Sequence, residues 1–158
     1  MASDEEMDFA VQWEETVSQL YDLALAGTSK KRGGFIPVSA KLAARVLAEM
    51  RTDVTGYHHI VDTDSIRHIQ KEHGGIREIL RGQVPIVRTD VLRLRLVMTE
   101  PDTLILAEVG RHGLTRIEMT KALLGYSYTC IVELQRGRKW IVPVTSYKRS
   151  GLQVFSVV

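Results

Sequence analysis

The spacing of apolar residues changes from a helical period in the first two thirds of the chain to an alternating period in the last third. Between residues 8 and 26, apolar side chains recur at steps of three and four, which is typical of one face of an amphipathic helix. From residue 103 onward, apolar and polar positions alternate, which is typical of strands with one buried face. Helices followed by strands predict an α+β fold, with N-terminal helices packed on a four- to five-stranded antiparallel sheet.

The same patterns, together with Gly, Pro and capping residues, set the expected bounds of each element. Helices are predicted over residues 8–26, 39–50, 62–75 and 89–97, with a further helical turn near 76–82. Short extended segments are predicted at 35–38, 57–61 and 84–86, and strands at 103–109, 114–121, 126–134, 139–147 and 152–157. Pro143 has no N–H to donate to a sheet ladder, so it predicts an edge position or a bulge.

Charge is distributed unevenly along the chain. Residues 1–22 contain seven acids and no Lys or Arg, so the remaining residues carry 12 acids against 21 Lys and Arg. We expect residues 1–34 to form an acidic helix and a basic linker, and residues 35–158 to form a single α+β domain. A basic body favours an anionic partner. Alternatively, the acids are there because negative charge stabilises the start of a helix.

The composition excludes several classes of protein. Cys130 is the one cysteine, which excludes an intramolecular disulfide and a cysteine-based zinc site. The five histidines match no zinc motif, so we expect neither metal nor cofactor. No apolar run reaches the length of a membrane span, and the acidic start is unlike a secretory signal. We expect a cytoplasmic protein without a membrane partner; virion association or delivery into a target cell are the alternatives.

The predicted helix at residues 62–75 concentrates groups that transfer protons and bind anions. Arg67, His68, Lys71 and His73 lie on it, and Asp62 or Thr63 can cap its start, while Gly74 or Gly75 can end it. The two histidines are five residues apart, about 140° around a helix, so they do not share a face. His73 lies in the last turn, where the helix dipole favours a positive charge. We therefore place His73 first and His68 second as catalytic candidates, with a structural role as the alternative for each.

A second group of candidate residues ends the strand predicted at 139–147. Period two places Thr145 and Tyr147 on one face, where Thr145 can donate to a phosphate oxygen and Tyr147 can stack on a base. Lys148 and Arg149 follow as candidate contacts to a phosphate backbone, and Arg116 extends this basic track on an earlier strand. The alternative is a buried tyrosine that anchors the sheet beside a solvated basic turn.

The order of these motifs resembles the phage-associated branch of the barnase–EndoU–colicin–RelE-like ribonuclease superfamily. The resemblance covers roughly residues 55–150 and is carried by Arg67-His68-Ile69, Lys71-Glu72-His73-Gly74, Val84-Pro85-Ile86, Glu100-Pro101-Asp102 and Thr145-Ser146-Tyr147-Lys148. It implies a sheet with the site on its face, and metal-independent cleavage of RNA. It also implies a toxin that is restrained by an immunity or antitoxin protein. A histidine just before the glycine matches the pattern of the family, which again points to His73.

The chemistry agrees with the residues. Metal-independent cleavage uses the 2′-hydroxyl of RNA as nucleophile and needs a base, an acid and cations for the phosphorane charge. Histidine suits the proton transfers, and Arg and Lys, with Arg67 and Lys71 among the candidates, suit the phosphate. We therefore expect a toxin-like RNA endonuclease of phage or bacterial origin, with tRNA among its candidate substrates. The alternative is a non-catalytic module on a degenerate nuclease fold, which binds RNA or inhibits a host protein.

Overall fold

The structure, a computed structural model, describes residues 3–110 and 112–151. Its helices are α1 (Asp4–Ala26), α2 (Ala40–Met50), α3 (Thr63–His73), α4 (Arg77–Leu80), α5 (Arg88–Leu92) and α6 (Leu94–Thr99). Its strands are β1 (Arg32–Pro37), β2 (His58–Asp62), β3 (Thr103–Leu106), β4 (Arg116–Leu123), β5 (Tyr126–Gln135) and β6 (Trp140–Ser150). The strand expected at residues 152–157 lies outside the described residues.

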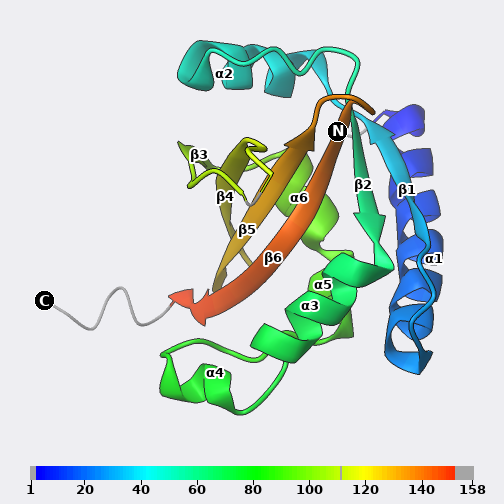
Figure 1. Cartoon of the computed structure of the whole chain (residues 1–158), viewed down its shortest axis with the longest axis vertical. Coiled ribbons are helices and arrows are strands. Elements are labelled where there is room, and N and C mark those ends of the chain that lie inside the picture. Colours follow the sequence, from blue (N-terminus) through cyan, green and yellow to red (C-terminus); the bar gives the residue numbers. More distant parts are fainter. Residues whose placement is uncertain (1–2, 111, 152–158) are drawn as a thin grey trace, which may run out of the picture.

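The strands form one sheet in the order β1-β2-β6-β5-β4-β3 (Figure 1). All neighbours are antiparallel except β2 and β6, which are parallel. The α+β fold with an N-terminal helix on a mainly antiparallel sheet is therefore confirmed, although the sheet has six strands rather than four to five. The difference arises because the extended segments at 35–38 and 57–61 join the sheet as β1 and β2.

The register of the sheet separates a buried face from an outer face. Tyr128, Cys130, Val132 and Leu134 share one face of β5, as the alternation predicted, and all four are fully buried. Helix α6 packs against β4 and β5, and its Leu94, Val97 and Met98 share one core cluster with these residues. The opposite side, which we call the outer face, carries half-exposed β5 residues such as Ile131, Glu133 and Gln135.

Strand β6 lies inside the sheet, between β2 and β5, and it contains an irregularity next to Pro143. Ile131 pairs with Thr145 and Val132 pairs with Pro143, so β6 has one extra residue between these pairs. A bulge is one of the two settings predicted for this proline, and it lets Pro143 occupy a central strand. Because opposed residues share a face, Trp140, Thr145 and Tyr147 all lie on the outer face, on both sides of the bulge.

The N-terminal helix α1 is part of the same core as the sheet. It begins with a capping box, in which Ser3 accepts from the Glu6 N–H and Glu6 accepts from the Ser3 N–H. Trp13 is 2% exposed and its indole Nε1 donates to the Leu92 carbonyl at 2.9 Å. Residues 27–31 then lead directly into β1, so the acidic helix and the basic linker pack as part of the domain.

One predicted helix is divided in the structure. The segment expected as a single helix at residues 89–97 forms α5 and α6, which meet at Arg93. The N-cap residue of α5 is Val87 and not Asp90. The Asp90 carboxylate accepts from the Val87 N–H at 2.8 Å. The short first helix brings Asp90 beneath the sheet, where it is fully buried.

Candidate active site at the ends of helix α3 and strand β6

Helix α3 is fixed by local signals at both ends, and these agree with the sequence. The Asp62 carboxylate accepts from the Ser65 N–H at 2.7 Å, and the Gly74 N–H donates to the Gln70 carbonyl at 3.0 Å. Ile66 and Ile69 are fully buried, so the helix is held against the core along one side. His73, its last residue, is thereby placed beside the end of β6, as α3 packs along this strand (Figure 1).

The His73 ring is anchored by a buried carboxylate. Its Nδ1 lies 3.0 Å from Oε2 of Glu78, whose side chain is 0% exposed. The other carboxylate oxygen, Oε1, accepts from the Arg81 guanidinium at 3.0 Å. A carboxylate on one ring nitrogen sets the orientation of an imidazole and leaves its second nitrogen for a substrate. Sequence reasoning missed Glu78 because it lies beyond Gly74 and Gly75, outside the helix that carries the histidine.

Tyr147 is the second aromatic side chain at this place. The His73 and Tyr147 ring centroids are 5.5 Å apart, with 38° between the ring planes. The guanidinium carbon of Arg149 lies 5.8 Å from the Tyr147 ring centroid. The side chains predicted from the end of α3 and the end of β6 therefore meet, although they lie far apart in the sequence.

The extended segment Val84–Ile86 ties these two chain ends together. The Ile86 N–H donates to the His73 carbonyl at 2.8 Å, and the Val84 N–H donates to the Lys148 carbonyl at 2.9 Å. This segment was predicted to be extended, and its backbone bonds explain how the end of α3 keeps its position against β6.

Thr145 and Lys148 occupy opposite sides of β6. Thr145 shares the outer face with Tyr147, two residues away, and its hydroxyl is buried without a hydrogen-bond partner in the described part of the chain. Lys148 points to the buried face, is 5% exposed, and places its Nζ 2.7 Å from Oδ2 of Asp90. The structure therefore brings Thr145 to the side of His73 and Tyr147, and it places the Lys148 ammonium in the core.

Asp90 organises a buried polar network that sequence reasoning missed. Its carboxylate accepts from the Tyr128 hydroxyl at 2.5 Å and pairs with Lys148 and with Arg93. Burial, followed by the hydrogen bond to Asp90, raises the pKa of Tyr128 to about 12. Every strongly polar group in this network has a partner, as a buried charge requires.

The remaining predicted site residues are spread over the surface. His68 and Lys71 are exposed on α3. Arg116 pairs with Glu133 at 3.1 Å. Along β5, four residues separate Glu133 from Thr129, the residue opposite Tyr147, which is roughly 13 Å. The structure therefore does not bring His68 or Arg116 to His73.

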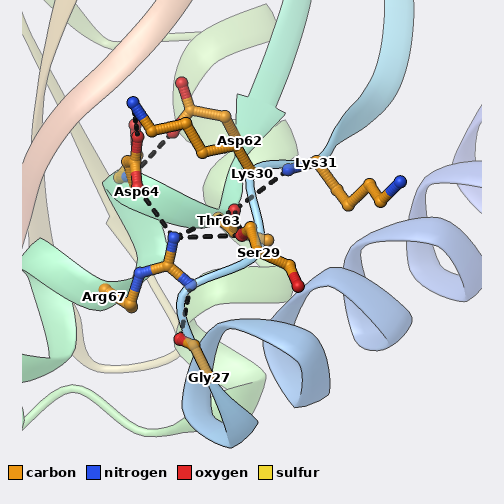
Figure 2. A network of polar contacts seen from close by, with 9 residues as sticks. Gly27, Ser29, Lys30, Lys31, Asp62, Thr63, Asp64 and Arg67 are labelled. Atoms are coloured by element: carbon orange, nitrogen blue, oxygen red, sulfur yellow. Dashed lines mark hydrogen bonds and ion pairs between the residues drawn. The ribbon is translucent and has the colours of Figure 1, made fainter.

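Arg67 has a different setting, shown in Figure 2. Its guanidinium donates to the Gly27 carbonyl at 2.9 Å and to the Ser29 carbonyl at 3.1 Å, and it pairs with Asp64 at 2.7 Å. Thr63 also donates to Ser29, at 2.6 Å. These contacts hold residues 27–31 against the start of α3, so Arg67 joins the N-terminal segment to the domain.

No cluster of three or more His, Cys, Asp or Glu side chains suited to a metal ion occurs within residues 3–110 and 112–151. No helix in the described part of the chain is long and apolar enough to cross a membrane.

Comparison with known proteins places the chain in a family. The model of the family described as phage-Barnase-EndoU-ColicinE5/D-RelE like nuclease3 matches residues 37–156. The chain belongs to this family. The match to this nuclease family includes His73, Glu78, Thr145 and Tyr147, whereas α1 and most of β1 precede it. No curated protein and no solved structure matches the chain.

Proposed function

We propose that this member of the nuclease family is a metal-independent RNA endonuclease of the toxin-like kind. The observation that supports it most is the His73 ring, which a buried carboxylate orients beside Tyr147 at the end of the sheet. A histidine held on one side by a carboxylate is the arrangement that general acid–base catalysis uses. The family explains why such a pair would act on nucleic acid.

In this proposal, His73 transfers the proton at the reacting phosphate. The 2′-hydroxyl of the RNA attacks the adjacent phosphorus, the 5′-oxygen leaves, and the products are a 2′,3′-cyclic phosphate and a 5′-hydroxyl. One group must take the proton of the 2′-hydroxyl and one must give a proton to the leaving oxygen, and each transfer contributes about 10²- to 10⁴-fold. We assign to His73 the transfer of a proton to the leaving oxygen, because Glu78 orients its ring at the end of α3.

Groups around His73 hold the substrate. Tyr147 offers a ring on which a base stacks, and Arg149, which lies over that ring, supplies charge for a phosphate. Lys71 adds a second exposed cation on α3. The Thr145 hydroxyl, buried without a partner, donates to a phosphate oxygen after a small rearrangement. His68, the second candidate from the sequence, is exposed on another side of the same helix, so in this proposal the proton of the 2′-hydroxyl passes to solvent water.

An RNA-cleaving protein of this kind needs restraint in the cell that makes it, and we propose an immunity or antitoxin protein as that partner. Helix α4 and the residue before it carry apolar side chains that face solvent: Ile76 is 79% exposed and Leu80 is 89% exposed. They flank Glu78, so a protein bound there would also cover His73. Exposed apolar side chains in a group are typical of a protein-binding surface.

The test is incubation with total RNA and with tRNA in the presence of EDTA, followed by identification of the new ends. The proposal predicts cleavage that EDTA leaves unchanged and products with 2′,3′-cyclic phosphate ends. Substrates with 2′-O-methyl groups should resist cleavage, because they lack the nucleophile. Cleavage that EDTA abolishes would contradict the mechanism. RNA binding without cleavage would instead favour the non-catalytic module.

A further inference from the structure

A second group of aromatic and cationic side chains lies where β1 meets the start of β6. The guanidinium carbons of Arg32 and Arg138 lie 5.0 Å and 4.9 Å from the Trp140 ring centroid, and Phe35 meets the same ring edge-on at 6.0 Å. We call these four residues the Trp140 cluster. Arg32 and Arg138 are exposed and Phe35 is 47% exposed, so solvent reaches all three side chains that surround the tryptophan.

The charges of this cluster are available to a ligand. Within the described residues, neither Arg32 nor Arg138 forms an ion pair with a carboxylate. Arg136 and Lys139, exposed in the turn between β5 and β6, lie next to Arg138 in the sequence. Guanidinium groups that stack on an aromatic ring keep their N–H groups for phosphate.

The Trp140 cluster and the His73 site lie on the same face of the sheet. Trp140 opposes Gln135 and Tyr147 opposes Thr129, and the register places both pairs on the outer face. Seven residues of a bulged strand separate Trp140 from Tyr147, roughly 20 Å. Glu133, an acid on this face, is paired with Arg116 at 3.1 Å. A single strand of RNA that is bound at His73 would have to span this distance to reach the Trp140 cluster.

A groove of about 330 Å³ adjoins the cluster between α1 and β1, which lie side by side (Figure 1). It is lined by Phe9, Gln12, Trp13, Thr16, Arg32, Gly33, Gly34, Phe35 and Ile36. Gly34 forms part of its wall with φ at +83°, and a Cβ there would lie 2.7 Å from the Trp13 ring. The lining combines aromatic rings with one cation, Arg32, which is the chemistry that a nucleobase and its phosphate require.

We propose that the Trp140 cluster is a second RNA-binding site, which holds a single-stranded segment of the substrate roughly 20 Å from His73. Arg32 and Arg138 contact phosphates, and Phe35, at the rim of the groove, stacks on a base. Base stacking on exposed aromatic rings and Arg planes is how proteins bind single-stranded RNA with little sequence preference. The inference rests on the proposed function for its substrate, but it concerns binding rather than cleavage.

The test compares single-stranded RNA of two lengths. Fluorescein-labelled oligouridines of 4 and 15 nucleotides are titrated with the full chain carrying His73→Ala, with and without Arg32→Gln plus Arg138→Gln. Binding to the 15-mer should weaken about tenfold at 100 mM salt, and its salt slope should fall by about 1.4, because two phosphate contacts are lost. Binding to the 4-mer should weaken less, because a short strand can bind at the His73 site or at the Trp140 cluster but is not held by both at once. Phe35→Ala should also weaken binding to the 15-mer by roughly tenfold.

The matched control replaces two exposed cations elsewhere, Lys41→Gln plus Arg51→Gln, at the two ends of α2. It should leave binding to both oligonucleotides nearly unchanged. An equal loss in the control, or unchanged binding of the 15-mer by the Arg32/Arg138 variant, would overturn the second site. In the chain that retains His73, unchanged KM for long RNA in the Arg32/Arg138 variant would also overturn it and leave the nuclease proposal intact. Binding that depends on the cluster without any cleavage would support this site and contradict the nuclease.

Discussion

His73 depends on one residue, Glu78, for its position. The Glu78 carboxylate is fully buried and is held between the His73 ring and the Arg81 guanidinium. Glu78 touches no substrate in our proposal, so it is a positioning residue that acts through the imidazole. The pair also shows why the histidine is at the end of α3 rather than within it: Gly74 and Gly75 let the chain turn back toward the ring.

We expect Glu78→Gln to lower kcat by about 10- to 100-fold with little change in KM, because the ring loses its orientation while the surface that binds RNA remains. The measurement is steady-state cleavage of a labelled RNA in EDTA. Glu72→Gln, which changes an exposed carboxylate on α3, is the control and should keep wild-type kcat. A raised KM with an unchanged kcat in Glu78→Gln would contradict a positioning role.

His59 makes a residue-scale prediction about stability. It is 1% exposed, neither ring nitrogen has a hydrogen-bond partner within the described residues, and burial lowers its pKa to about 4. As the pH falls, His59 is therefore protonated in the unfolded chain near pH 6.5, before it is protonated in the folded chain. The contribution of the neutral ring to stability is complete above pH 6.5 and is lost as the pH falls toward 4.

When the pH is lowered from 7 to 5, His59 should reduce the free energy of unfolding by about 2 kcal/mol. Urea unfolding at the two pH values measures it, and His59→Leu should show a fall that is smaller by that amount. His112→Gln, which replaces an exposed histidine before β4, is the control and should leave this fall in place. Equal pH dependence in the wild type and in His59→Leu would exclude His59 as its source.

At the scale of elements, strand β6 carries two functions on its two faces. Tyr147 and Arg149 belong to the outer face and the candidate site, whereas Lys148 crosses into the core and meets Asp90 from α5. The ion pair fixes a short helix to the underside of the sheet, and the Val84–Ile86 segment fixes α3 to the same end of β6. The end of β6 is thus held by two contacts that the chemistry itself does not use.

Lys148→Met should destabilise the protein by about 3 kcal/mol, because it leaves the Asp90 carboxylate buried without its closest cation. Arg149→Met, one residue further along β6 and exposed, should change stability by no more than about 0.5 kcal/mol. Urea unfolding of both variants at pH 7 provides the comparison. If Lys148→Met keeps its stability but loses RNA affinity, the lysine acts at the substrate instead of in the core.

At the scale of the whole molecule, the sequence predicts those features of the fold that depend on neighbouring residues, such as the bounds of an element and its buried face. The bounds of α3 follow from Asp62 and Gly74, and the buried face of β5 follows from alternation along one strand. The missing N–H of Pro143 predicts an edge position or a bulge, and the structure has the bulge. The sequence does not predict that Glu78 turns back to His73, or that Asp90 meets Lys148, because these pairs depend on how separate elements pack. The same limit applies to Arg67: its positive charge suggested contact with RNA, but the sequence did not predict that its guanidinium donates to the Gly27 and Ser29 carbonyls.

The family match supports a nuclease fold. In our account, the acid–base group of this nuclease is His73, at the end of α3. The most direct measurement is the rate of RNA cleavage in EDTA by the wild type, His73→Ala and His112→Ala, the last being an exposed histidine away from β6. The account predicts that His73→Ala lowers the rate by about 100-fold or more while His112→Ala cleaves like the wild type. Equal rates for the wild type and His73→Ala would contradict it.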